Sequence, residues 1–113
     1  MPVVALVSNK GGAGKTTLAT HLAAALDRRG KTVLVDADPQ GSALHWSMVA
    51  QANGETGVRV VEAGADLARE GRRLGKSHDF VIIDCPPAIG AAQSRAALAV
   101  CDLALVPVLP SPL

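Results

Sequence analysis

The segment Lys10-Gly-Gly-Ala-Gly-Lys-Thr-Thr17 constrains the fold more than any other part of the chain. It follows an apolar, valine-rich run at residues 2–7 and precedes a stretch whose apolar residues recur at helical spacing up to residue 29. A glycine-rich backbone can wrap so that successive amides face one ligand, and the helix that follows adds its free N–H groups and the positive end of its dipole. A strand, a glycine-rich loop and a helix in this order predict a phosphate-binding site.

This loop matches the general nucleotide-binding pattern G-x-x-x-x-G-K-[ST], except that Asn9 stands at the first glycine position. In that pattern the lysine, here Lys15, reaches the β and γ phosphates, and the hydroxyl of Thr16 ligates Mg²⁺. A glycine-rich turn that binds nothing is the alternative, and the position between a strand and a helix disfavours it. The backbone amides expected to face the phosphates belong to Gly11, Gly12, Ala13 and Gly14.

Three aspartates stand at the ends of predicted strands: Asp36, Asp38 and Asp84. The carboxyl ends of parallel strands share one edge of a sheet, so these carboxylates should lie near the glycine-rich loop. Asp84 has the position of a carboxylate that holds Mg²⁺ through water, and its alternative role is to cap a turn. Pro39 favours a turn after Asp38, so one of Asp36 and Asp38 could face the metal and the other the attacking water; a solvated turn is the alternative.

Hydrophobic periodicity predicts strands that alternate with helices along the whole chain. The predicted strands are 2–7, 31–35, 58–62, 80–84 and 103–108, and the predicted helices are 16–29, 42–51, 65–74 and 91–100. This alternation indicates βαβ units and an α/β fold with a parallel sheet flanked by helices. We expect residues 1–113 to form a single domain.

The composition limits the classes of partner. Apolar residues make up 49% of the chain and charged residues 19%, which excludes a disordered protein. Trp46 and Phe80 are the only aromatic residues, so a base-stacking surface is not expected. Cys85 and Cys101 lack metal-ligand spacing and are interpreted as buried apolar residues of a reducing compartment. With no leader pattern and no apolar run long enough for a membrane span, a cytoplasmic protein is expected.

The remaining polar residues are interpreted as structural. His21 and His45 have no partner at metal or triad spacing, and Trp46 is expected to be a core residue. A basic group lies on or near the helix predicted at 65–74 and should be a solvated face, with contact to nucleic-acid phosphates as the alternative. Its members are Arg69, Arg72, Arg73 and Lys76.

Four motifs together closely resemble the ParA/MinD family of deviant Walker A ATPases, and most of all its small plasmid-partition ParA members. They are the loop at 10–17, Val35-Asp-Ala-Asp-Pro-Gln-Gly41, Val81-Ile-Ile-Asp-Cys-Pro-Pro87 and Pro107-Val-Leu-Pro-Ser-Pro-Leu113. The resemblance implies a P-loop NTPase-type fold, ATP and Mg²⁺ as ligands, and an ATP-dependent homodimer.

The same resemblance implies a role for each matching residue. Lys10 would cross to the phosphates of the partner subunit, and Lys15 would bind those of its own. Thr17 would support the α phosphate, and Asp38 would orient the hydrolytic water. Thr16 and Asp84 would hold the metal, with Asp36 in its surroundings.

The function implied is ATP hydrolysis that drives plasmid or chromosome segregation, stimulated by a centromere-binding ParB-type partner. Such a protein would be nucleoid-associated and would bind non-specific DNA. Family members run well beyond residue 113, so the chain would be the N-terminal half of the usual domain, with most of the DNA-binding segments missing. Whether this shortened chain hydrolyses ATP stays open.

Three alternatives remain. A MinD-like division-site ATPase needs a C-terminal amphipathic helix. An iron–sulfur carrier needs a paired-cysteine motif, which Cys85 and Cys101 do not supply. The third is an inactive truncated remnant.

Overall fold

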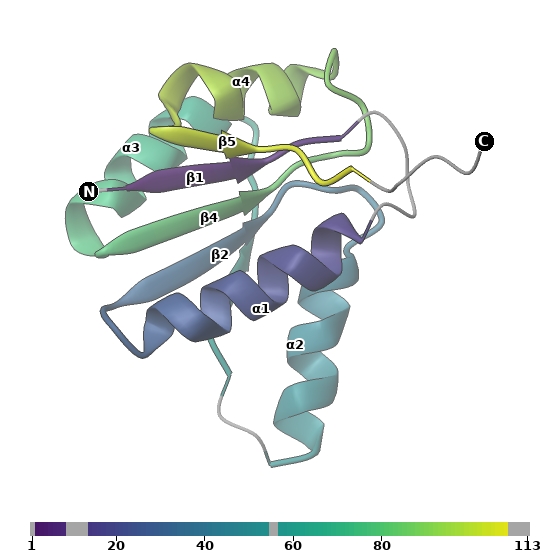
Figure 1. The fold of residues 1–113 in the computed structure, drawn as a ribbon, viewed down its shortest axis with the longest axis vertical. Helices are drawn as coiled ribbons and strands as arrows, with labels where there is room; N and C mark the ends of the chain where they lie inside the picture. Colours follow the sequence, from purple (N-terminus) through teal and green to yellow (C-terminus); the bar gives the residue numbers. More distant parts are fainter. Residues whose placement is uncertain (1, 9–13, 55–56, 109–113) are drawn as a thin grey trace.

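The central sheet of the protein is parallel throughout, as the alternating pattern predicts (Figure 1). The computed structural model describes residues 2–8, 14–54 and 57–108. Within this part of the chain the strands are β1 Val3–Leu6, β2 Thr32–Asp36, β3 Arg59–Glu62, β4 Phe80–Asp84 and β5 Leu103–Leu105, and the helices are α1 Lys15–Asp27, α2 Ser42–Ala52, α3 Leu67–Ser77 and α4 Ala92–Val100. The predicted α/β fold is therefore confirmed.

The strands are arranged in the order β3-β2-β4-β1-β5. Strands β1 and β4, which are far apart in sequence, are neighbours, and Leu6 lies opposite Asp84 in their register. On the other side of β4, Asp36 of β2 lies opposite the same aspartate. This strand order brings the carboxyl ends of β1, β2 and β4 together at one edge of the sheet.

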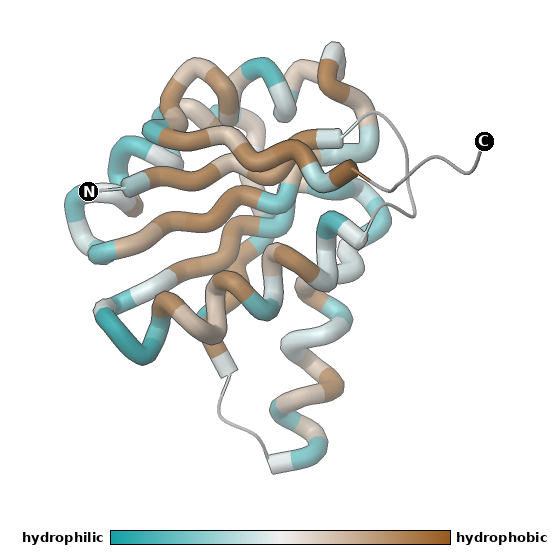
Figure 2. Tube along the Cα trace, viewed as in Figure 1, coloured by the Kyte–Doolittle hydropathy of each residue, from teal (hydrophilic) through white to brown (hydrophobic). Residues whose placement is uncertain are grey.

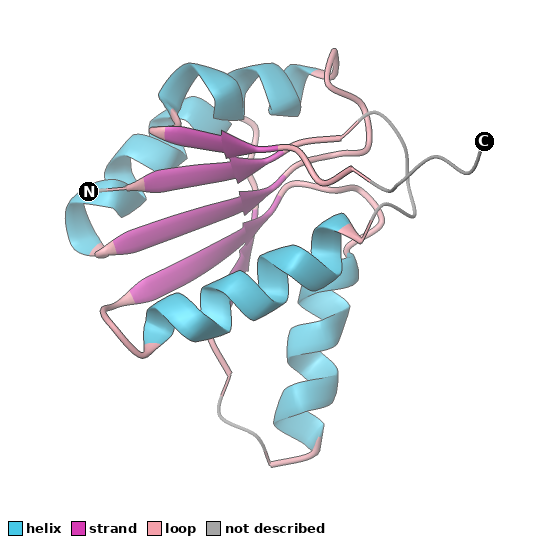
Figure 3. Ribbon diagram, in the orientation of Figure 1, coloured by secondary structure: helices cyan, strands magenta, loops and turns pink. Residues whose placement is uncertain are grey.

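Helices cover both faces of the sheet, because successive side chains of a strand point to opposite faces. Val4 and Leu6 pack with α1 and α2 residues such as Ala19 and Ala43. Val3, Ala5 and Val7 belong to the opposite layer, which contains residues of α3 and α4. Figure 2 shows the resulting apolar strands between the helices, and Figure 3 shows the three layers.

Helix α3 begins and ends later than predicted, at Leu67 and Ser77 instead of 65 and 74. It begins after Asp66 because the Asp66 side chain accepts a hydrogen bond from the Arg69 amide, which is the usual N-cap arrangement. At its other end His78, which sequence reasoning did not single out, is buried and leaves the helical conformation. Its Nδ1 lies 3.1 Å from the Leu74 carbonyl oxygen.

Strand β5 is shorter than the predicted 103–108. Its partner β1 ends at Leu6, and the Val7 amide donates a hydrogen bond to the Leu105 carbonyl just beyond that end. Within the described residues no strand pairs with the outer edge of β5. Leu103 of this strand is 53% accessible, and Val106, the residue directly after it, is 52% accessible.

None of the helices in the described ranges combines the length and apolar character that a bilayer crossing requires.

Candidate functional site

The site begins where helix α1 starts, directly after the glycine-rich loop. Gly14 is the N-cap residue and has φ +77°, a left-handed conformation that glycine adopts without strain. No side chain caps the helix, and its first turn contains no acidic residue. The free amides and positive dipole end of α1 therefore remain available to an anion. Lys10, Gly11, Gly12 and Ala13 lie outside the described residues.

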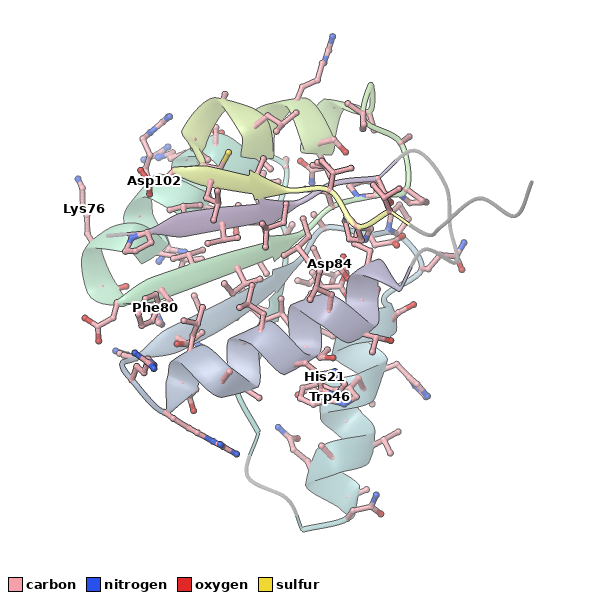
Figure 4. The ribbon with its side chains drawn as sticks, viewed as in Figure 1. His21, Trp46, Lys76, Phe80, Asp84 and Asp102 are labelled. Carbon is pink, nitrogen blue, oxygen red and sulfur yellow. The ribbon has the colours of Figure 1, made fainter. Side chains whose placement is uncertain are left out.

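Lys15, the first residue of α1, points inward and forms an ion pair with Asp84 at the end of β4. Its exposed fraction is only 6%, and that of Asp84 is 0%. The Thr16 hydroxyl donates a hydrogen bond of 2.9 Å to the second carboxylate oxygen of Asp84. Figure 4 shows Asp84 beside the first turn of α1. The structure thus brings together three residues that the sequence assigned to phosphate and metal binding.

Burial raises the pKa of Asp84 above its ordinary value, because the charged carboxylate loses its hydration. The hydrogen bond and charge of Lys15 act in the opposite direction, as does the hydrogen bond from Thr16, whereas the nearby charge of Asp36 adds to the increase. The net shift is upward. A further cation near Asp84 would therefore stabilise its ionised form.

Asp38 faces the same lysine from the loop after β2. Its Oδ2 lies 4.0 Å from Lys15 Nζ, and its Oδ1 accepts a hydrogen bond from the Gln40 amide. The turn is closed by a hydrogen bond of 2.9 Å from the Gly41 amide to the Asp38 carbonyl. The predicted turn at Pro39 thus leaves Asp38 directed at the lysine of the phosphate-binding loop.

Asp36 is directed elsewhere. Its Oδ1 accepts a hydrogen bond from the Asp38 amide at 3.1 Å, and its Oδ2 accepts one from the Leu44 amide at 3.0 Å. Asp36 and Asp38 therefore have different partners, as the turn predicts. Sequence reasoning did not find the contact to helix α2, although the absence of a local capping side chain before Ser42 is a signal for it.

Thr17 is exposed at the first turn of α1, where a ligand could reach it, and its carbonyl accepts a hydrogen bond from the Thr20 hydroxyl. Cys85, next to Asp84, is fully buried, and burial raises the pKa of its thiol to about 12. This agrees with its interpretation as a buried apolar residue, whereas the same interpretation was wrong for Cys101, which packs against the core but is only partly buried.

The other candidate residues lie apart from this cluster. His21 and His45 are exposed on α1 and α2, and Trp46 lines a cavity of about 290 Å³ between α1, α2 and β3, so it is only partly a core residue. The basic group of α3 is exposed and makes no ion pair with other described residues, as expected for a solvated face. Its members are Arg69, Arg72, Arg73 and Lys76.

Comparison with known families identifies the type of domain. Residues 4–100 match the model of the CobQ/CobB/MinD/ParA nucleotide binding domain. The chain is similar to the maintenance of carboxysome distribution protein A of Halothiobacillus neapolitanus, with 40% identity over 111 residues. The aligned region covers 97% of this chain and 51% of that protein. It is 32% identical to the chromosome partitioning protein ParA of Myxococcus xanthus, over 93% of this chain and 51% of the relative.

A similar solved structure is cobyrinic acid a,c-diamide synthase of Mycobacterium smegmatis with bound ADP and magnesium. The TM-score is 0.76 at 26% identity, and the match covers 95% of this chain and 59% of that one. The chain spans about half the length of the curated relatives that it matches.

Proposed function

The chain belongs to the CobQ/CobB/MinD/ParA family of nucleotide-binding domains, and from this premise we propose that it binds ATP with Mg²⁺ and hydrolyses it in a ParA-type partition cycle. One observation carries the proposal. Lys15, Thr16 and Asp84 are in direct contact at the start of α1, and the carboxylate of Asp38 lies 4.0 Å from the same lysine. Phosphoryl transfer needs a phosphate-binding cation, a metal site and a group that orients water.

The donor set fits Mg²⁺, which prefers oxygen ligands and is usually held by one or two protein groups together with substrate phosphates. The Thr16 hydroxyl and the Asp84 carboxylate are such groups, and they lie 2.9 Å apart. Within residues 2–8, 14–54 and 57–108 no cluster of three or more His, Cys, Asp or Glu could hold a metal alone. We therefore assign the metal to Thr16 and Asp84 together with the nucleotide; when bound, it would neutralise phosphate charge. Asp36 would contribute its charge to the surroundings of the metal.

The protein groups act on the nucleotide in different ways. The amides of Gly11, Gly12, Ala13 and Gly14 would surround the phosphates, with Thr17 at the α phosphate. Lys15 would leave Asp84 for the β and γ phosphates. Asp38, already directed into this space, would orient the attacking water.

The wider cycle requires more than this chain's described residues. Lys10 would reach the nucleotide of a second copy, so ATP would favour a homodimer. A ParB-type centromere-binding protein would stimulate hydrolysis, and the ATP-bound form would bind non-specific DNA. A partition role would also place the protein in the cytoplasm, in association with the nucleoid. The alternatives of a MinD-like ATPase and an inactive remnant remain.

A second candidate cargo follows from one comparison. The identity to the carboxysome distribution protein of Halothiobacillus neapolitanus is 40%, against 32% to the chromosome partitioning protein of Myxococcus xanthus. The same ATPase chemistry could therefore position a protein body instead of DNA. The nucleotide site is common to both candidates.

Calorimetry with ATP and ADP in the presence of Mg²⁺ tests the shared step. We expect the full chain to bind both nucleotides, Lys15→Ala to bind neither, and Lys76→Ala to bind as the parent does, because Lys76 is an exposed lysine of α3. Single-turnover measurement of phosphate release then tests hydrolysis. Absence of nucleotide binding by the folded parent chain would refute the proposal, and binding without hydrolysis would support the remnant.

A further inference from the structure

Helix α2 lacks a capping group of its own. Its N-cap residue is Gly41, in the left-handed conformation with φ 66°, and no side chain of its first turn is acidic. A helix start leaves amide groups without partners, and a carboxylate there is stabilising. Here the Leu44 amide donates to Asp36 Oδ2, which belongs to the last residue of β2, eight positions earlier. The side chain of Asp36, at the end of strand β2, therefore caps helix α2.

The second oxygen of the same carboxylate fixes the loop between them. Asp36 Oδ1 accepts a hydrogen bond from the Asp38 amide, so a single side chain holds both the beginning of the turn and the start of α2. Asp36 is itself held firmly. It is 3% exposed, it lies opposite Asp84 in the sheet, and its carbonyl accepts a hydrogen bond from the Ala63 amide.

Among the residues that the structure describes, the Asp38 side chain has no comparable anchor. It accepts a hydrogen bond from the Gln40 amide within the same turn and otherwise faces Lys15 at 4.0 Å. Within the described residues, the Asp36 side chain joins the Asp38 amide to the start of α2, and the Ala37 amide attaches the beginning of the turn to β4 through a hydrogen bond of 2.9 Å to the Asp84 carbonyl. The Ala37 bond holds the residue before Asp38, whereas the Asp36 side chain holds the Asp38 amide itself, so the position of the Asp38 carboxylate relative to Lys15 depends on Asp36.

We propose that Asp36 is a positioning residue, which holds the Asp38 turn and the N-terminus of α2 as one unit and so sets Asp38 relative to the phosphate site. The proposal rests on the ATPase function proposed above. A carboxylate that orients water must be held in place, because a misplacement of about 1 Å can lower the rate about a hundredfold. Asp38 lies in a turn and not in a helix or strand. Asp36 at the end of β2 therefore holds it in place.

The first test does not depend on activity. In Asp36→Asn, one oxygen can still accept, but the amide nitrogen cannot, so one of the two bonds is lost. We expect amide hydrogen exchange, followed by NMR in the full chain, to become at least about tenfold faster at Asp38, at Leu44 or at both. The amide of Ala63, which bonds to the backbone of Asp36, serves as the internal control. Unchanged exchange at both Asp38 and Leu44 would overturn the proposal.

The second test separates positioning from helix stability and from metal binding. Ser42→Asp places a carboxylate in the first turn of α2 and compensates its dipole, but it cannot bond the Asp38 amide. We expect Asp36→Asn to keep nucleotide affinity within about threefold and to lose roughly tenfold to a hundredfold in single-turnover hydrolysis. Adding Ser42→Asp should restore the helix signal in circular dichroism without restoring the rate. Ser42→Asp alone should turn over as the parent chain does.

Two results would contradict the positioning role. Full recovery of the rate in the double variant would assign Asp36 to helix stability alone, and recovery at high Mg²⁺ would assign it to the metal. If the parent chain hydrolyses no ATP, the proposed function fails, while the amide-exchange experiment still decides whether Asp36 holds the turn.

Discussion

Lys15 and Asp84 form an ion pair in the interior of the protein, although 69 positions separate them in the sequence. The pair exists because β1 and β4 are neighbours, which places the residue after the glycine-rich loop beside the end of β4. Lys15 is assigned to the phosphates of the nucleotide and Asp84 to its Mg²⁺. Within the protein the two side chains neutralise each other's charge. This relationship leads to the first prediction.

Lys15→Ala should lower the free energy of unfolding by about 3–5 kcal/mol near neutral pH, since it leaves a buried carboxylate without its cation. Losing Lys15 also raises the pKa of Asp84 further, because the lysine holds it down. A folded-state pKa above the ordinary 3.8 means that the folded protein binds the proton more tightly than the unfolded chain. The loss of stability should thus be small at acidic pH and grow as pH rises through the raised pKa.

Urea unfolding of both proteins from acidic to neutral pH measures this difference. The double variant Lys15→Ala/Asp84→Asn is the control, because it removes the titrating group and should flatten the pH dependence. A loss of unfolding free energy that is equal at all pH values would contradict the assignment of the loss to the Lys15–Asp84 ion pair.

Thr16→Ala should weaken Mg²⁺-dependent nucleotide binding about tenfold, because it removes both the hydroxyl ligand and the hydrogen bond to Asp84. Thr16→Ser keeps the hydroxyl and should retain most of the affinity. Calorimetric titrations at several Mg²⁺ concentrations distinguish the two variants. Equal nucleotide affinity of Thr16→Ala and Thr16→Ser would exclude a role for the hydroxyl group.

The two lysines of the loop should fail in different ways. Lys15→Ala should abolish nucleotide binding, whereas Lys10→Ala should keep binding and lose turnover and ATP-dependent association, because Lys10 is assigned to the nucleotide of a second copy. Nucleotide titration, phosphate release and sedimentation with ATP measure the three properties. No change in either variant would refute the roles assigned to both residues.

Cys85 should be inert to thiol reagents in the folded protein. With a pKa of about 12, only about one thiol in ten thousand is ionised at pH 8, and the side chain is fully buried. A maleimide reagent should modify Cys101, which is half-buried, and reach Cys85 only in urea. Cys101→Ser is the control and should remain unmodified when folded; rapid modification of that variant would show that the β4 layer opens.

The outer edge of β5, which pairs with no strand among the described residues, should promote self-association together with the exposed Val106 directly after it, because a free strand edge with apolar side chains is a template for pairing. Val106→Lys should therefore slow aggregation measured by light scattering. Val49→Lys is the matched control, because Val49 is similarly exposed, at 47% against 52%, but lies on helix α2. Equal effects of both substitutions would point to net charge and not to the strand edge.

Much of this site could be predicted from local patterns. The glycine-rich loop, the buried run ending at Asp84 and the turn at Pro39 each depend on neighbouring residues, whose periodicity and backbone preferences are written in the sequence. For that reason the α/β class and the family were predictable. The boundaries of α3 and β5 were harder to predict. The hydrogen bond from the Arg69 amide to Asp66 sets the start of α3, and the length of β1 limits β5.

The sequence by itself determined that a glycine-rich segment with the pattern of a phosphate-binding loop stands between a strand and a helix, and which acidic residues follow the strands near it. Only the tertiary structure decided that Lys15 pairs with Asp84 and that Asp36 caps helix α2 while holding Asp38. The reason is physical. These contacts depend on the strand order β3-β2-β4-β1-β5 and on the register of its pairs, which are set by packing of the whole sheet and not by any single segment.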